Sequence, residues 1–192
     1  MTAKDSTPSA RRIELLEACY GYVLERGLTD LSLRPLAAAV GSSPRVLLFL
    51  FDSKEGLIRE ILARARRDEL AFLHRLGDDR PDLITVAERV WEWLADDGHS
   101  GLLRLWVEVF GRSLTEPDGP WAGFARATVD DWLTMFAASQ PARERRTAAA
   151  AARRTAVLAV LRGALLDLLA TGDRRRTTAA VHSTLAALRP VP

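Results

Sequence analysis

Apolar residues recur every three or four positions along most of the chain, the spacing that places side chains on one face of a helix. Between residues 11 and 26 these positions hold Ile13, Leu16, Cys19, Tyr20, Val23 and Leu24. We find no run in which apolar and polar residues alternate, as they would along a half-buried strand. The pattern predicts an all-α protein of about nine helices.

Capping and breaking residues bound the first helices. Gly27 ends the first helix, and Ser32 is expected to cap a short second helix that ends at Gly41. A third helix follows at once, because Ser43 is a good N-cap and Pro44 suits the first helical position. Two short helices joined by a tight turn are therefore predicted after the first helix.

A fourth, longer helix is predicted to begin at Asp52 or Ser53. Asp52 and Glu55 have the spacing of a capping box, and apolar positions continue far beyond them. After breaks rich in Gly, Pro and Asp, further helices are expected at 82–97, 100–114, 119–138, 143–171 and 174–188. We divide the chain into a domain of residues 1–53 and a second helical domain of residues 54–192.

Composition narrows the class of protein. The 192 residues include one cysteine, Cys19, which excludes disulfide scaffolds and zinc sites built from several cysteines within one chain. The net charge of +2 permits a nucleic-acid partner without requiring one. The N-terminus lacks the apolar run of a signal peptide, and the longest apolar stretch is too short to cross a bilayer. We therefore expect a cytoplasmic protein that does not enter a membrane.

Motifs of catalysis or metal binding are missing from the sequence. His74, His99 and His182 are scattered and share no ligand spacing. The chain has no glycine-rich phosphate loop and no nucleophile elbow. We expect no metal, no cofactor and no enzymatic activity, with a small all-α enzyme as the less favoured alternative.

Residues 32–57 have the features of a helix-turn-helix, the motif whose second helix enters the major groove of DNA. Ala37 and Ala38 are small enough for a close helix contact, and Gly41 tolerates the positive φ that the turn needs. Apolar anchors stand at suitable spacing in Leu36, Val40, Leu47 and Phe51.

This three-helix unit ahead of a long fourth helix resembles the TetR family of transcriptional regulators, most clearly over residues 11–62. The matching segments are Glu-Arg-Gly-Leu (25–28), Ser-Leu-Arg-Pro-Leu-Ala (32–37), Val-Gly-Ser-Ser (40–43) and Phe-Asp-Ser-Lys-Glu-Gly-Leu (51–57). The resemblance implies that the third helix reads bases and that the start of the fourth binds phosphate. Carried over to this chain, it places the following residues on DNA: Ser32, Arg34, Ser43, Pro44, Arg45, Val46, Leu48, Phe49 and Lys54.

The third helix differs from the family pattern, which commonly has Tyr at the position of Leu48 and His or Tyr near Phe49. Among its groove-facing residues only Arg45 can hydrogen-bond a base edge, and Arg pairs best with guanine. We hypothesise one strongly read G in each half-site, with thymine methyl groups against Val46, Leu48 and Phe49. Two alternatives stay open: Leu48, Phe49 and Leu50 pack on the fourth helix, or they dock a partner protein.

Basic residues at the N-terminus offer a second kind of DNA contact. The polar arm of residues 1–10 and the start of the first helix contain Lys4, Arg11 and Arg12. These side chains can reach a minor groove or nearby phosphates. A solvated arm without a DNA contact is an equal alternative.

Aromatic residues concentrate between residues 91 and 136. The resemblance implies that this region binds a small effector, and pockets for small molecules are mostly apolar and aromatic. We expect the pocket to be lined by Trp91, Trp106, Phe110, Trp121, Phe124, Trp132 and Phe136. Arg104, Glu108, Arg112 and Asp131 are available as polar groups. The alternative is that the aromatic residues form the core.

The last two helices have wide apolar stripes. A four-helix interface between two subunits is predicted from Val157, Leu158, Leu161, Leu165, Leu168, Val181, Leu185 and Leu188. Alternatively, both stripes pack inside one subunit. A two-fold dimer would present two reading heads to a pseudo-palindromic operator. We predict a homodimeric, ligand-responsive transcriptional regulator, a repressor released from double-stranded DNA by an apolar or aromatic effector; a helical protein–protein interaction module is the main alternative.

Overall fold

The computed structural model describes residues 9–77 and 82–189, and these ranges contain nine α-helices, one 3-10 turn and no strand. The helices are α1 (Ala10–Arg26), α2 (Leu33–Ala39), α3 (Pro44–Phe51), α4 (Lys54–Gly77), α5 (Leu83–Leu94), α6 (Ser100–Thr115), α7 (Phe124–Ala138), α8 (Ala148–Thr171) and α9 (Arg174–Ala187), with the 3-10 turn at Asp97–His99. The all-α prediction is confirmed. Lys4 and most of the predicted arm lie outside the described residues.

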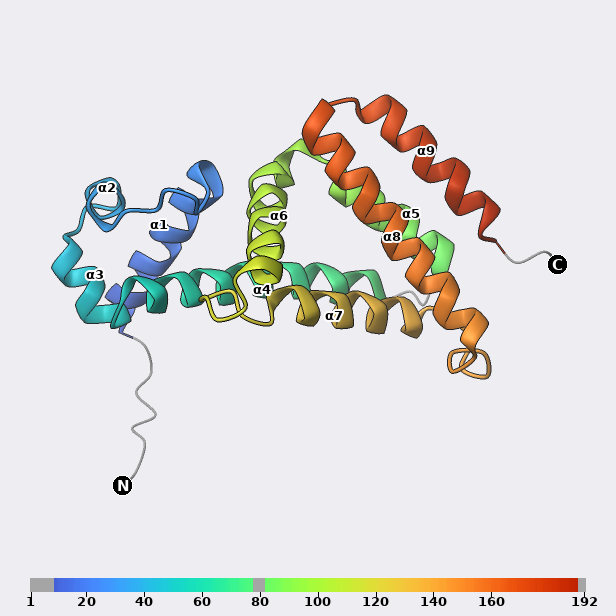
Figure 1. Cartoon of the computed structure of the whole chain (residues 1–192), viewed down its shortest axis with the longest axis horizontal. Coiled ribbons are helices and arrows are strands. Elements are labelled where there is room, and N and C mark those ends of the chain that lie inside the picture. Colours follow the sequence, from blue (N-terminus) through green and yellow to red (C-terminus); the bar gives the residue numbers. More distant parts are fainter. Residues whose placement is uncertain (1–8, 78–81, 190–192) are drawn as a thin grey trace, which may run out of the picture.

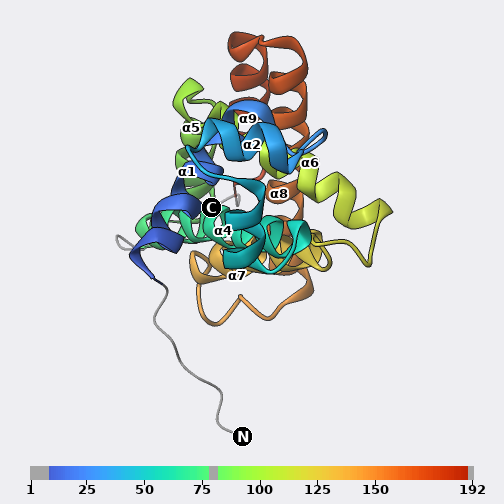
Figure 2. The same cartoon turned by 90° about the vertical axis from the view of Figure 1, so that its left-hand side faces the viewer.

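The first three helices form a head at one end of the molecule, to which the start of α4 is joined (Figures 1 and 2). Its core contains Cys19 and Val23 of α1, Leu36 of α2 and Leu47 of α3, all at most 1% exposed. The same core extends beyond α3 through Leu57, Ile61, Leu105, Val109 and Trp121. The head is therefore packed against the rest of the chain, and the division at residues 53 and 54 stays a prediction.

Local signals around α2 and α3 set the helix-turn-helix geometry. The Ser43 hydroxyl accepts a hydrogen bond from the Val46 amide at 3.3 Å, and Pro44 occupies the first turn, as predicted. Gly41 has the expected positive φ of 62°. Ser32 is the residue before α2, but its side chain makes no capping hydrogen bond, so that part of the prediction is wrong.

The junction between α3 and α4 differs from the predicted capping box. Asp52 follows α3 with φ of 66°, a left-handed conformation, so it ends one helix rather than capping the next. Ser53 supplies the cap, since its hydroxyl accepts from the Gly56 amide at 2.9 Å. The pairing of Asp52 with Glu55 is therefore wrong, and Ser53, the second of the two predicted start residues, is right.

Helix α4 leaves the head and runs into the second part of the molecule, where α7 lies alongside it (Figure 1). Helix α6 stands across α4 and contacts α1 as well as α7 and α8. Helices α5, α8 and α9 pack together at the far end. The second core, centred on Val90, Phe136, Val157 and Leu161, fills the space between these helices. Helices α4 and α6 thus connect the head to the second core.

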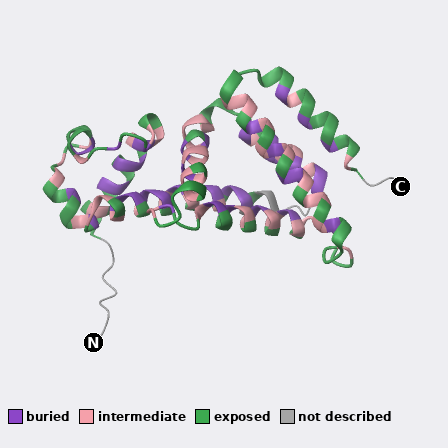
Figure 3. Ribbon diagram, viewed as in Figure 1, coloured by how far each residue is buried: buried purple, intermediate pink, exposed green. Residues whose placement is uncertain are grey.

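The apolar stripes of α8 and α9 face the inside of their own chain. Six of the predicted interface residues are buried in the second core, namely Val157, Leu158, Leu161, Leu165, Val181 and Leu185, while Leu168 and Leu188 are partly buried against it. Since a side chain buried within one chain has no surface left for a second subunit, the predicted interface is wrong for those six. Figure 3 shows exposed residues on the outer faces of the same helices.

Candidate functional site

Helix α3 exposes an apolar face on the head. Leu47 and Phe51 are buried and anchor the helix, whereas Leu48 is 40% exposed and Phe49 is 82% exposed. The alternative in which Leu48, Phe49 and Leu50 pack on α4 is therefore wrong for Leu48 and Phe49, whereas Leu50 is partly buried against the core that the head shares with α4. Arg45, at the start of α3, is also exposed and makes no hydrogen bond or ion pair with any described residue.

Residues beside α3 supply the other predicted DNA contacts. Ser32, Arg34 and Ser43 are exposed, and Lys54 is half-buried at the start of α4. Helix N-termini concentrate amide N–H groups and favour anions. The structure thus leaves these predicted side chains accessible, while their contact with DNA stays a proposal.

The side chain of Arg12 is held by contacts with α3 and α4 and is not free to reach DNA. Its guanidinium donates to the Leu50 carbonyl at 3.2 Å and to Glu60 at 2.9 Å, and it lies 5.2 Å from the centre of the Phe51 ring. It therefore ties α1 to α3 and α4, which makes the predicted minor-groove role wrong for this conformation. Arg11 forms an exposed ion pair with Glu14 at 2.8 Å.

A second cluster joins α1 to α4 beneath the head. Arg64 donates to Glu17 at 2.7 Å and also bonds Asp68, and its guanidinium lies over the Tyr20 ring. The Tyr20 hydroxyl donates to Asp68 at 2.9 Å. Burial and the neighbouring Asp68 raise the pKa of Tyr20, so the phenol keeps this proton. The cluster thus ties α1 to α4 through hydrogen bonds, ion pairs and a ring contact.

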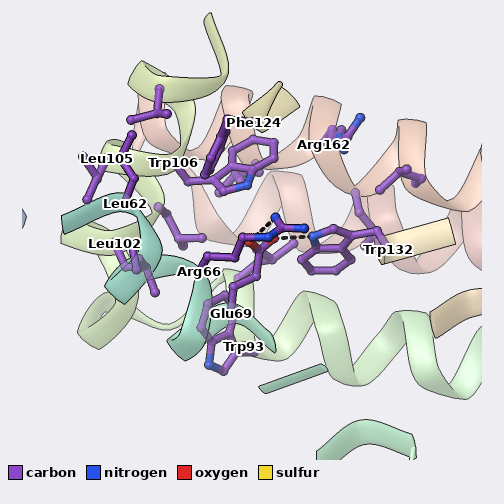
Figure 4. A pocket seen from close by; sticks show the side chains of 17 residues that line it. Leu62, Arg66, Glu69, Trp93, Leu102, Leu105, Trp106, Phe124, Trp132 and Arg162 are labelled. Carbon is purple, nitrogen blue, oxygen red and sulfur yellow. Dashed lines mark hydrogen bonds and ion pairs between the residues drawn. The ribbon is translucent and has the colours of Figure 1, made fainter. Parts of the chain in front are cut away.

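A cavity lies between α4, α5, α6, α7 and α8 (Figure 4). The volume of the cavity is about 40 Å³, which is room for a few water molecules. Most of the lining is aliphatic or aromatic, and the exceptions are Arg66, Glu69 and Arg162. An apolar pocket with a few polar groups is the usual form of a small-molecule site.

The sequence analysis predicted only part of the residues that line the cavity. Three of the predicted aromatic residues, Trp106, Phe124 and Trp132, line it. The other four do not, so the prediction is wrong for them. Phe136 is core, and Phe110 stacks on Trp106. The indoles of Trp91 and Trp121 donate elsewhere, to the Thr178 hydroxyl and the Glu116 carbonyl respectively, each at 3.0 Å.

The lining also contains residues that the sequence analysis did not place there, among them the charged residues Arg66, Glu69 and Arg162 and the aromatic Trp93. Trp93 is stacked between Phe72 and His99, with ring centres 4.2 and 4.3 Å away. Arg162 interrupts the longest apolar stretch of the sequence, and a charge at such a position is a usable signal for a buried functional group.

Glu69 is the buried acid of the pocket. Its Oε1 accepts from the Trp132 indole at 2.6 Å, and its Oε2 lies 3.8 Å from Arg66. Arg66 also bonds Asp131 and donates to Thr128 at 3.2 Å. Burial raises the pKa of Glu69, although the Trp132 bond and Arg66 oppose the rise. The dashed lines in Figure 4 mark the contacts of Glu69 with Arg66 and Trp132.

Arg162 and Trp106 are polar groups without matching acceptors. The Arg162 guanidinium lies 5.5 Å from the Trp106 ring centre and 4.9 Å from that of Phe110. Arg162 Nη2 and Trp106 Nε1 are buried and have no hydrogen-bond partner among the described residues. Burial lowers the pKa of Arg162, an effect that the field of Glu69 opposes. Such orphaned donors are rare in folded proteins and call for an explanation.

Helix α6 joins the cavity to the head. Glu108, one turn from the cavity residues Leu105 and Trp106, accepts from the Leu28 amide at 2.9 Å and from the Thr29 hydroxyl at 2.8 Å. At the other end of α6, a Cβ on Gly101 would lie 2.7 Å from the Leu24 carbonyl oxygen, so only glycine allows this approach of α6 to α1.

None of the four polar groups proposed from the sequence lines the cavity. Glu108 holds the α1–α2 turn, Arg112 covers the Trp121 ring at 4.7 Å, and Asp131 pairs with Arg66. Arg104 is exposed. Within the described ranges, no cluster of three His, Cys, Asp or Glu side chains could hold a metal ion, and no helix is long and apolar enough to span a bilayer.

Comparison with solved structures identifies the fold. A transcriptional regulator from Rhodococcus sp. Rha1 superposes with a TM-score of 0.77 at 20% identity, over 94% of this chain and 99% of that one. A TetR regulator from Haloarcula marismortui gives 0.72 at 16% identity, over 93% and 95%. The multidrug-binding protein EbrR in complex with imidazole gives 0.67 at 24% identity, over 100% and 99%.

These proteins define a class: the chain has the fold of the TetR-family transcriptional regulators over nearly its whole length. No protein-family profile matches the chain, and no curated protein matches it by sequence. The fold predicted from the helix-turn-helix segments is therefore confirmed.

Proposed function

We propose that this protein is a ligand-responsive, DNA-binding transcriptional repressor of the TetR type. The observation that carries the proposal is the combination of an exposed, capped third helix with an apolar cavity between the other helices in one fold. An interaction module needs no such cavity, and the solved structures that share the fold are transcriptional regulators rather than enzymes.

Regulation in this proposal passes through α6. The helix lines the cavity with Leu102, Leu105 and Trp106, and it holds the head through Glu108. Because the cavity accommodates only a few waters in this conformation, an aromatic effector must displace its walls. A displaced α6 would carry the α1–α2 turn with it and shift the head away from the position that DNA requires. Helix α4 is the second connection.

The repressor acts as a homodimer in this proposal, because two heads are needed for a pseudo-palindromic operator. In this proposal the dimer interface is the outer face of α8 and α9, and not their buried apolar stripes. On α8 this face combines small residues with Leu166, which is 50% exposed, at Ala152, Ala159, Gly163, Leu166 and Ala170. Close packing of two such faces favours small side chains. The test is the molar mass of Leu166→Arg in sedimentation, which should fall to that of a monomer.

DNA binding is tested by selecting sites from a random duplex pool with the full chain. We expect an enriched palindromic site whose affinity falls steeply with salt, because phosphate contacts release counterions. Arg45→Ala should cost about 1–3 kcal/mol and relax preference at one position in each half-site. Lys54→Ala should weaken all sequences alike and lower the salt slope by about 1.

Arg126→Ala is the matched control, since Arg126 is an exposed arginine on α7, outside the head. Its site and affinity should equal those of the wild type. If the pool gives no enrichment even at low salt, the DNA-binding function is wrong, and the exposed face of α3 becomes a docking face for another protein.

A further inference from the structure

The unexplained donors of the cavity carry information about its ligand. All the polar groups on the Glu69 side are matched: its carboxylate faces the Trp132 indole and Arg66, and Arg66 also bonds Asp131. On the other side, Arg162 Nη2 and Trp106 Nε1 are buried without an acceptor. In Figure 4, Trp106 and Arg162 lie above the dashed chain of Arg66, Glu69 and Trp132. The cavity therefore lacks an acceptor, not a donor.

Charge points to the same missing group. Arg66 has Asp131 as a direct ion-pair partner, but Arg162 has no carboxylate within ion-pair distance among the described residues. It is held instead over the faces of Trp106 and Phe110. Arg162 as a whole is only partly buried, but its Nη2 is fully buried, and a buried N–H group ordinarily has an acceptor because leaving it unpaired is costly. An anionic ligand group would be both its counter-ion and its hydrogen-bond acceptor.

The remaining walls determine the rest of the ligand. Phe124 and Trp132 offer flat apolar surfaces, while Trp93, whose ring is stacked between Phe72 and His99, joins Leu62, Leu158 and Leu161 in closing the sides. Such a lining suits a flat ring system and offers few partners to a polar one.

We propose that the effector is an aromatic carboxylate, with its ring among the tryptophans and its carboxylate between Arg162 and Trp106. This inference rests on the proposed function for the consequence of binding, but not for binding itself. A cationic aromatic ligand would instead approach Glu69, whose oxygens already have partners and whose carboxylate is deeply buried.

Calorimetric titration of the full chain, without DNA, tests the proposal with three probes. They share a naphthalene ring and differ in the charge of the substituent: 2-naphthoate, 2-naphthamide and 2-naphthylmethylammonium. We expect the naphthoate to bind at least tenfold more tightly than the amide and the ammonium compound to bind most weakly. In Arg162→Met, which keeps an unbranched apolar side chain but removes the guanidinium, the preference for naphthoate over the amide should disappear. Trp106→Phe should reduce it by a smaller factor.

Arg104→Met is the matched control, because Arg104 is an exposed arginine on α6 outside the cavity. Its preference should equal that of the wild type. Preference for the ammonium probe, equal binding of acid and amide, or an unchanged preference in Arg162→Met would each overturn the proposal. Thermal unfolding of Arg162→Met checks that the fold is retained. Failure of DNA binding in the site selection would overturn the proposed function and leave this result standing.

Discussion

The hydrogen bonds of Glu108 allow a quantitative test of how the head is attached to α6. In Glu108→Ala, the Leu28 amide and the Thr29 hydroxyl lose their acceptor. Hydrogen bonds to charged groups contribute about 1.5–3 kcal/mol. Leu28 is buried, whereas the bond from Thr29 is exposed and contributes less. With the carboxylate 19% exposed, we expect a loss of about 2 kcal/mol in the free energy of unfolding.

Two assays separate the local effect from the global one. Denaturant unfolding should show the loss in stability, and amide exchange should become about 30-fold faster at Leu28, since about 1.4 kcal/mol is a factor of ten. Glu108→Gln keeps one acceptor and should lose about half as much. Thr29→Ala is the control for the exposed bond and should cost less than about 1 kcal/mol. Wild-type exchange at Leu28 in Glu108→Ala would refute the attachment of the head through this carboxylate.

Three further outcomes are expected. Burial raises the pKa of Glu69, so folding favours its protonated form. The stability of the wild type relative to Glu69→Gln should therefore be highest below pH 4.5 and fall as pH rises, by at most about 1.4 kcal/mol per pH unit. A difference in stability that does not change with pH in urea titrations would contradict this. Burial also raises the pKa of Cys19 to about 11, so iodoacetamide at pH 8 should modify it only at the rate of unfolding, and rapid native labelling would show otherwise. Phe49→Ala should leave the melting temperature unchanged, while Phe51→Ala, which removes a buried ring, should cost about 3–5 kcal/mol; equal losses would mean that the exposed face of α3 is misassigned.

Local signals were sufficient to predict the head. A Ser-Pro pair starts α3 wherever the rest of the chain lies, and a glycine is needed in a turn of positive φ. These features depend on neighbours in sequence, so they were predicted correctly at Ser43, Pro44 and Gly41. The choice between Asp52 and Ser53 as cap was harder, because both residue types cap helices and only the backbone angle separates them.

The spacing of apolar residues along a helix does not show which part of the molecule packs against its apolar face. Val157, Leu161 and Leu165 form a stripe that would suit a partner subunit or the core, and the choice depends on α5 and α9, which are distant in sequence. The tryptophans present the same difficulty. Trp91 and Trp93 are two residues apart and so face different ways on α5, one toward α9 and one into the cavity. Which of them meets the cavity is set by tertiary packing.

The absence of a side chain at Gly101 has a consequence for how this protein can change. Gly101 meets α1 and Glu108 meets the turn after it, so the cavity-facing part of α6 lies between two fixed attachments. Trp106 lines the cavity and packs against the second core, not against the head, so it takes part in neither attachment. Under the proposed function, recognition of the effector and transmission of its signal would therefore fall on separate positions of one helix. The same scaffold can acquire a new chemical specificity, by evolution or by design, while the response of the head is retained.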